Sequence, residues 1–421
     1  MNVKSFLPGR LLRLITLVGP GFFLIGFSIG TGSVVSMASA GSRYGMTMLW
    51  ALFLSCVFSF VLLEAFGRYT MVTGKSAMYS IRQFPFMGKP VAIITMIGLV
   101  TVEVMALAGI IGIMSDLMSE WTGMLFSHNG WNPVWIALAM IIGTYLLISI
   151  GKYQFFEKVL IFFVSMMGIS FILTMFMVIP SPVEIIKGSL PRIPDEANAS
   201  MIIGALVGTT LTAPTFVTRS ILVQQKGWTV EHLKLGRIDS FVAAFFMFII
   251  SMAVMACAAG TLYLVDKPVE DVITMVVLLE PLAGQFALSI FIVGILGAGL
   301  SSIIPISMLA PLLFADYRGV PVDMKSTSFR VLCGVALLFG LIVPVFHARP
   351  VLVMVASQCF QIFVLPIVTV SIIYLINKKE LMGQHKAGFW LNFGCISTLI
   401  FSLIISYQSV LGLIHYFNEL M

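Results

Sequence analysis

Two apolar segments of this chain are interrupted near their middle by residues that disfavour a helix. The first reads Gly-Thr-Gly-Ser at positions 30–33, and the second reads Gly-Thr-Thr-Leu-Thr-Ala-Pro-Thr at positions 208–215. Lipid cannot satisfy the N–H and C=O groups that such breaks expose, so these groups must face protein or a wet cavity. Together with the neighbouring hydroxyls they can bind an ion or a small polar solute. One break in each half of a chain is typical of the substrate site of a secondary transporter.

The composition places both segments in a membrane. Hydrophobic residues make up 59% of the 421 residues and charged residues only 10%, whereas soluble domains contain about 25% charged residues. The five cysteines stand in apolar segments without Cys-x-x-Cys or Cys/His spacing. The sequence therefore predicts an all-α integral membrane protein without a disulfide framework or a structural zinc site.

Membrane-spanning helices need about 20 mostly apolar residues each. This length predicts eleven spans, at residues 16–41, 45–67, 90–115, 132–150, 156–180, 200–225, 239–264, 286–314, 329–346, 350–376 and 389–416.

The distribution of basic residues predicts the orientation of these spans. With the N-terminus inside, 19 of the 24 lysines and arginines fall on the inner side, and the outer side keeps Arg43, Lys187, Arg192, Lys267 and Arg349. This bias follows the positive-inside rule. We therefore expect a multi-pass protein of the inner or plasma membrane, with a cytoplasmic N-terminus and an outer C-terminus.

The two breaks divide the chain into equivalent halves. Spans 1–5 (residues 1–180) form a first repeat and spans 6–10 (residues 200–376) form a second, with span 11 (residues 389–416) added. Because five is odd, the second repeat must run inverted relative to the first. Inverted repeats with matched breaks are typical of carriers that work by alternating access.

Short motifs along most of the chain resemble the NRAMP family of divalent-metal transporters, which have the LeuT-like fold. The matching stretches are Gly19-Pro20-Gly21, Ala40-Gly41-Ser42-Arg43-Tyr44-Gly45, Glu64, Arg68, Val72-Thr73-Gly74-Lys75, Glu157, Asp239, Ala298-Gly299-Leu300-Ser301-Ser302, Ser357-Gln358, Leu365-Pro366 and Leu381-Met382-Gly383. Each motif is weak alone, but their order and spacing are those of the family. The resemblance implies proton-coupled symport of a divalent metal.

The family's metal ligands are replaced in this chain. Its metal-binding Asp and Asn in span 1 fall on Gly30 and Ser33, and its Met in span 6 falls on Thr212. Its His in span 6 falls on Arg219. In span 3 the family's Asp falls on Glu103, and its Glu, three residues later, falls on an alanine.

The remaining groups predict a substrate cavity of neutral oxygens without an acidic side chain of its own. The resemblance adds the backbone carbonyls of Phe27 and Thr209. The candidate binding residues are Phe27, Gly30, Thr31, Ser33, Thr209, Thr212, Thr215 and Gln358. Neutral oxygens alone bind divalent cations weakly, so an anionic or zwitterionic solute is the alternative substrate.

Two charges are expected in mid-membrane, where an unpaired charge costs several kcal/mol. The family positions that match Glu103 and Arg219 face one another, and we predict that these two residues form an ion pair. Such a pair either lies on a coupling route or merely holds spans 3 and 6 together. An arginine stays protonated and cannot relay protons as a histidine can.

Three further charged residues have structural or gating interpretations. Glu64 and Arg68 are spaced i, i+4 at an inner helix end and predict a local ion pair. Asp239 either caps span 7 or joins an inner gate.

The sequence thus favours an NRAMP-like secondary transporter whose substrate is a metal ion, with a non-metal solute as the alternative. No phosphate-binding GxxxxGK[ST] motif is present, so an ATPase is not indicated. We expect no enzyme activity, no cofactor, no nucleic-acid partner and a monomer in the lipid bilayer.

Overall fold

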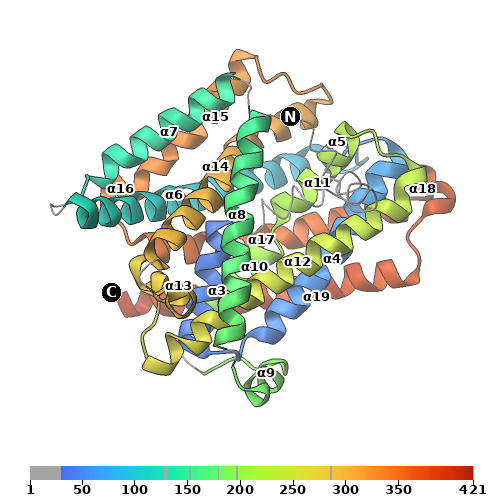
Figure 1. Cartoon of the computed structure of the whole chain (residues 1–421). Helices are drawn as coiled ribbons and strands as arrows, with labels where there is room; N and C mark the ends of the chain where they lie inside the picture. Colours follow the sequence, from blue (N-terminus) through green and yellow to red (C-terminus); the bar gives the residue numbers. More distant parts are fainter. Residues whose placement is uncertain are drawn as a thin grey trace, which may run out of the picture.

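The computed structural model describes residues 30–126, 130–150, 153–178, 180–195, 198–284 and 287–420. Within these ranges the secondary structure is helical and contains no strand. Figure 1 shows long helices packed side by side and crossing one another at varied angles. The first half of the predicted first span, with Phe27, lies outside the described residues.

The long helices come from the most apolar parts of the chain. They are α4 (Leu49–Thr73), α6 (Gly88–Phe126), α7 (Pro133–Ile150), α8 (Tyr153–Met177), α12 (Leu233–Gly260), α14 (Ala287–Arg318), α17 (Pro350–Asn377) and α19 (Phe389–Leu420). Shorter helices complete the core or cap its ends: α3 (Thr31–Tyr44), α5 (Ala77–Arg82), α9 (Pro182–Gly188), α10 (Ala199–Thr210), α11 (Ala213–Gln225), α13 (Glu280–Ala283), α15 (Thr327–Leu338), α16 (Ile342–Phe346) and α18 (Lys379–Met382).

The apolar helices confirm most of the predicted spans. Among the described residues, nine helical segments are long and apolar enough to cross a membrane, or ten if the bent pair α8–α9 counts as one. The nine segments coincide with predicted spans 2–4 and 6–11. The first predicted span is described only from residue 30 onward, so the total of eleven and the division into halves remain predictions.

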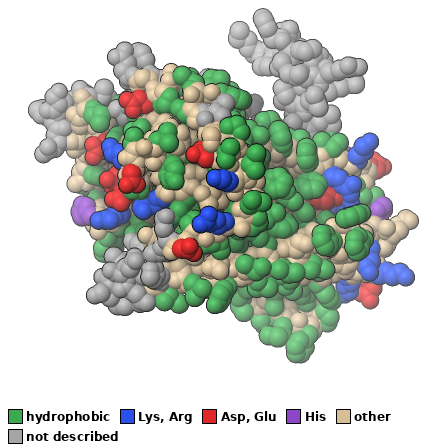
Figure 2. Space-filling model, turned by 90° about the horizontal axis from the view of Figure 1, so that it is seen from below, with side chains coloured by type: hydrophobic (Ala, Val, Ile, Leu, Met, Phe, Trp, Pro, Cys, Tyr) green, Lys and Arg blue, Asp and Glu red, His purple; other side chains and the backbone are tan. Residues whose placement is uncertain are grey.

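The surface has the character expected of a protein surrounded by lipid. In Figure 2 a broad zone of hydrophobic side chains lies between two groups of charged side chains. Large apolar side chains such as Phe53, Ile97, Leu146 and Ile400 are more than half exposed. In a soluble protein such a zone would be an aggregation hazard, whereas acyl chains cover it without cost.

The loops predicted to lie on one side of the membrane meet at one end of the structure. Arg82 donates to the carbonyl of Tyr317 (Nη1–O 2.6 Å), and Gln224 donates to the carbonyl of Gly74 (Nε2–O 2.9 Å). At the other end, Trp50 donates to the carbonyl of Arg192 at 3.0 Å. These contacts agree with the predicted grouping of loops; which end is cytoplasmic remains a prediction.

The core of the protein surrounds α10 and α11. The segment Ala199–Gln225 is wholly buried along its apolar window, and α10 packs against α3, α4, α17 and α19. Figure 1 places α10 near the centre of the bundle, beside α17. A helix enclosed in this way can be interrupted, because neighbouring helices supply partners for the backbone groups that the interruption frees.

Candidate functional site

The central helix is broken between α10 and α11, as the sequence predicts. The helix α10 ends at Thr210, α11 begins at Ala213, and Leu211 and Thr212 between them leave helical geometry (φ −105°, ψ 49° and φ −78°, ψ 117°). Pro214 stands in the first turn of α11, where its missing N–H costs no hydrogen bond. The break therefore follows from local sequence and lies inside the protein.

Two serine hydroxyls of α4 form hydrogen bonds with polar groups at the end of α10. Ser59 donates to the carbonyl of Thr210 (Oγ–O 2.6 Å), and the Thr210 hydroxyl lies 2.6 Å from Ser55 Oγ. The last carbonyls of a helix have no partner within it. Ser59 satisfies part of that need, and the two serines together fix the end of α10 against α4.

The start of α3, at the other predicted break, faces the same point. Gly30 is the residue before α3, and its carbonyl accepts from the backbone N–H groups of Ser33 and Val34 at 3.1 and 3.3 Å. Ser33 also lies within 3.5 Å of Ser251 on α12, oxygen to oxygen. The start of α3 is therefore held between α12 and the break in the central helix.

A cavity of about 30 Å³ lies between the start of α3 and the α10–α11 break. It is formed by α3, α6, α14, α17 and the α10–α11 break. Its lining residues are Gly30, Gly32, Ser33, Glu103, Ala106, Ile110, Thr209, Thr212, Ser302, Ile306, Met354, Gln358 and Gln361. A space of this size holds a single ion or about one or two water molecules.

One hydrogen-bonded chain crosses the cavity from α11 to α6. The Thr212 hydroxyl donates to Gln361 Oε1, and Gln361 Nε2 lies 3.5 Å from Glu103 Oε1, to which it donates. All three side chains are nearly fully buried. The amide of Gln361 thus links the break in the central helix to the carboxylate of α6.

Two glycines at the start of α3 make room for these side chains. A Cβ on Gly32 would lie 2.8 Å from Gln358 Nε2 and would collide with Met354 Cε. A Cβ on Gly30 would collide with Ser302 Oγ. The side chains of α14 and α17 therefore occupy the space that larger residues at positions 30 and 32 would need.

The structure brings together five of the eight predicted binding residues. Gly30, Ser33, Thr209, Thr212 and Gln358 line the cavity. Thr31 and Thr215 are buried but are not among the lining residues, and Phe27 lies outside the described residues. The binding role of the five remains a prediction.

The expectation of a cavity without an acidic side chain is wrong. Glu103 lines it, with only 3% of its surface exposed. Its helix, α6, packs against α17 and also contacts α3, which places the carboxylate beside the start of α3 and the α10–α11 break. The sequence places Glu103 in span 3 but does not reveal how closely span 3 passes the breaks.

The predicted ion pair between Glu103 and Arg219 is also wrong. Arg219, whose side chain is fully buried, pairs with Asp239 of α12. Its Nη2 lies 3.3 Å from both the carbonyl of Gly236 and the hydroxyl of Ser240. Asp239 stands in the second turn of α12, within reach of the long Arg219 side chain.

This pairing changes the interpretation of Asp239. The helix α12 begins at Leu233, so Asp239 stands inside the helix rather than at its cap. Trp228 adds a second contact, with its ring centre 5.8 Å from the Arg219 guanidinium. The pair joins the middle of α11 to α12, and neither residue lines the cavity.

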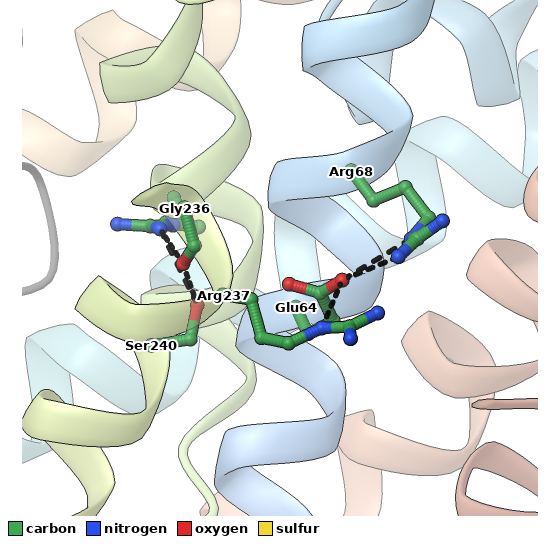
Figure 3. A network of polar contacts seen from close by, with 6 residues as sticks. Glu64, Arg68, Gly236, Arg237 and Ser240 are labelled. Carbon is green, nitrogen blue, oxygen red and sulfur yellow. Dashed lines mark hydrogen bonds and ion pairs between the residues drawn. The ribbon is translucent and has the colours of Figure 1, made fainter. Parts of the chain in front are cut away.

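The predicted pair between Glu64 and Arg68 is confirmed. Arg68 Nη2 lies 2.8 Å from Glu64 Oε1, and Arg237 of α12 approaches the same oxygen at 3.4 Å. Figure 3 shows Glu64 between these two arginines, with Gly236 and Ser240 on the neighbouring turns of α12. Glu64 therefore connects α4 to α12.

Three lining residues with polar or sulfur-containing side chains are not predicted as part of the site. Gln361 follows Gln358 by one helical turn, and this i, i+3 spacing of two amides in an apolar span is a signal that could have identified it. Ser302 is the last residue of a small-residue stretch that is typical of close helix packing. Met354 is one of 27 methionines and carries no distinguishing signal.

The cavity has few strong metal ligands. Among the described residues there is no group of three or more His, Cys, Asp or Glu side chains that could hold a metal ion. The available donors are one carboxylate, two amides, several hydroxyls and one thioether. Such a set suits weak, reversible binding of a cation rather than a permanent metal centre.

Comparisons with known proteins agree on one family. A sequence model described as "natural resistance-associated macrophage protein-like" (Nramp) matches residues 21–412. The divalent metal cation transporter MntH of Verminephrobacter eiseniae is 23% identical over 434 aligned positions, covering 98% of this chain and 92% of the relative. MntH of Brucella suis is 24% identical, covering 90% and 84%.

Solved structures share the fold. The manganese transporter of Eremococcus coleocola superposes with a TM-score of 0.76 at 16% identity, covering 98% of this chain and 88% of that one. MhsT, solved in complex with L-phenylalanine, superposes with a TM-score of 0.64 at 12% identity, covering 94% of this chain and 98% of that one. At these identities the likeness shows the fold alone.

Proposed function

The chain belongs to the natural resistance-associated macrophage protein-like (Nramp) family, and from this premise we propose that it carries a divalent metal ion across the membrane by alternating access. The relatives named as divalent metal cation transporters support the substrate class. The cavity at the break of the central helix supports the location of the site.

The single observation that carries the proposal is the buried carboxylate of Glu103 in this cavity. Divalent ions bind more tightly to sites whose ligands include negative charge. Glu103 supplies that charge, and the amides and hydroxyls around it supply neutral oxygens. Glu103, on a different helix, thereby compensates for the absence of the family's aspartate at position 30.

The size of the cavity argues against the alternative of an organic solute. Its volume is about 30 Å³, whereas sites for small organic ligands measure about 300–1,000 Å³. The space admits an ion with few or no waters. An anionic substrate is further disfavoured because Arg219 is paired with Asp239 and does not line the cavity.

A second, larger cavity supports alternating access. It measures about 260 Å³ and is lined by parts of α3, α10 and α17, with Arg43, Glu270 and Arg349 among its residues. On α17, Val351 and Val355 line this vestibule, and Met354 and Gln358 line the small cavity. About one helical turn separates the two spaces, so a modest movement of α3 or α10 would connect them.

Proton coupling by the route implied by the family is not part of the proposal. Arginine remains protonated at physiological pH, and Asp239 holds Arg219 in a buried ion pair. Position 219 therefore cannot pass protons in the manner of a histidine. We propose that Arg219 has a structural role in keeping α11 against α12.

Transport by purified protein in liposomes tests the function. Vesicles that contain a metal-quenched dye should show uptake of Mn²⁺ that saturates with concentration and exceeds that of protein-free vesicles. The same vesicles, with and without an imposed pH gradient, report whether protons contribute. Absence of Mn²⁺, Fe²⁺ and Cd²⁺ uptake by well-folded protein would contradict the proposed function.

A further inference from the structure

We propose that Glu103 supplies the one anionic ligand and Met354 the one sulfur ligand of the transported ion, so that the substrate is a transition ion that accepts thioether coordination rather than Mg²⁺ or Ca²⁺. The inference rests on the proposed function and names the ligands and the class of ion. In this assignment the strongest ligands come from α6 and α17, not from the start of α3 or the α10–α11 break.

The side chain of Met354 is positioned to reach the cavity. It lies between two glycines, since a Cβ on Gly109 would come within 2.8 Å of its Sδ and a Cβ on Gly32 would collide with its Cε. Ser357, one turn later on α17, donates to the Met354 carbonyl at 2.7 Å. The thioether thus lies between α3 and α6, in space that a side chain at either glycine would occupy.

Glu103 lacks a cationic partner. Among the described residues, no ion pair includes it, and its hydrogen-bond partner is the neutral amide of Gln361 at 3.5 Å. An isolated buried carboxylate is costly in the membrane interior. A positive ion in the cavity would provide the missing charge and stabilise the carboxylate where it stands.

The remaining donors do not discriminate among divalent ions. The amides of Gln358 and Gln361 and the hydroxyl of Thr212 are hard, neutral oxygen ligands, which Mg²⁺, Ca²⁺ and Mn²⁺ all accept. A thioether is a soft ligand and favours later or softer metals. Because all these groups border a space of about 30 Å³, one ion can contact the carboxylate and the sulfur together.

Packing is the other reason for a buried methionine, because its flexible side chain fills irregular gaps. Met114 on α6 provides the matched comparison. It is fully buried and also packs against a glycine, since a Cβ on Gly299 would collide with its Sδ, but it does not line the cavity. A role in packing alone predicts the same effect of substitution at both positions.

The experiment compares uptake and binding of Cd²⁺, Mn²⁺ and Mg²⁺ by the full chain in proteoliposomes and by calorimetry in detergent. The variants are Glu103→Gln, Glu103→Asp and Met354→Leu. Their controls are Asp116→Asn, which removes a carboxylate farther along α6 outside the cavity, and Met114→Leu. Thermal unfolding and size-exclusion profiles establish that each variant is folded.

We expect Glu103→Gln to lower uptake and affinity for all divalent ions by about tenfold or more, on the scale seen when metal-site residues are removed. Glu103→Asp, which keeps the charge but shortens its reach, should fall between this variant and the wild type. Met354→Leu should lower affinity for Cd²⁺ by about tenfold, lower it less for Mn²⁺ and leave Mg²⁺ unchanged. Both controls should match the wild type.

The possible failures are distinguishable. If the wild type neither transports nor binds any of the three ions, the proposed function fails and the ligand assignment fails with it. If the wild type transports Mn²⁺ but Glu103→Gln and Met354→Leu behave as their controls do, the function stands and the ligand assignment is overturned. An equal loss of Cd²⁺ and Mg²⁺ affinity in Met354→Leu would overturn the assignment of the sulfur.

Discussion

The hydroxyl of Ser302 occupies the space that any side chain on Gly30 would need. A Cβ built on Gly30 would collide with Ser302 Oγ and lie 3.2 Å from Ser302 Cβ. Ser302 is fixed there, because its hydroxyl donates to the carbonyl of Ala298 at 3.0 Å. The family's aspartate at this position is therefore incompatible with the packing of α14 in this chain.

The first prediction concerns restoring that aspartate. Gly30→Asp should destabilise the protein by about 1–3 kcal/mol, since overpacking forces neighbouring atoms apart. Adding Ser302→Gly should recover most of the loss in thermal stability measured in detergent. Equal stability of the single variant and the wild type would show that the start of α3 adapts without cost.

The second prediction concerns the buried pair of Arg219 and Asp239. Asp239→Asn should leave an uncompensated buried charge and cost about 3–5 kcal/mol of stability. Replacing both residues by apolar ones of similar size should cost much less. Arg237→Ala is the control, because that side chain is 60% exposed and exposed ion pairs contribute about 0–1 kcal/mol.

Chemical unfolding of the purified variants measures these differences as a double-mutant cycle. Additive losses from the two single substitutions would contradict a direct pairing.

The third prediction concerns the chain of hydrogen bonds across the cavity. Thr212→Val removes the donor to Gln361 but keeps the shape of the side chain, and should lower Mn²⁺ uptake with a cost to stability of about 1 kcal/mol. Thr215→Val is the matched control, since Thr215 is buried nearby but does not line the cavity. Uptake assays on both variants should separate them, and equal uptake would remove Thr212 from the site.

The fourth prediction concerns Gly32. Gly32→Ala should displace the ends of Met354 and Gln358, both flexible, so the protein should remain folded while its uptake of metal falls. Stability by thermal unfolding and uptake in vesicles are measured on the same preparation. A variant that transports normally would show that neither side chain needs its present place.

The fifth prediction concerns orientation. Lys75 and Lys187 are both exposed and are predicted to lie on opposite sides of the membrane. In a background without the five buried cysteines, Lys187→Cys should react with a membrane-impermeant thiol reagent in intact cells and Lys75→Cys only after lysis. The reverse pattern would invert the proposed topology.

The sequence predicts those features that depend on local pattern. Apolar length predicts nine of the spans that the structure contains, and the polar residues with Pro214 predict the break in the central helix. The pair of Glu64 and Arg68 follows from spacing alone. These features need no knowledge of which helices are neighbours.

The partners of Glu103 and Arg219 depend on how the helices pack, so the sequence does not predict them. The apolar pattern places the start of span 7 at Asp239, although α12 begins six residues earlier at Leu233, because helix boundaries are the least certain feature of a sequence. Glu103, Ser302 and Met354 likewise line the cavity from three different helices. No local sequence pattern predicts how these helices are rotated relative to one another. Long-range geometry therefore limits what the residues alone reveal about this site.

Thr212 has two positions at once: it stands in the two-residue joint between α10 and α11, and its hydroxyl belongs to the lining of the cavity. If the cavity binds the transported ion as proposed, a change in the angle at that joint moves a group that borders the ion, and an ion bound to that group restrains the angle. In that case the same residue couples ion occupancy to the orientation of the two half-helices, without a distant relay.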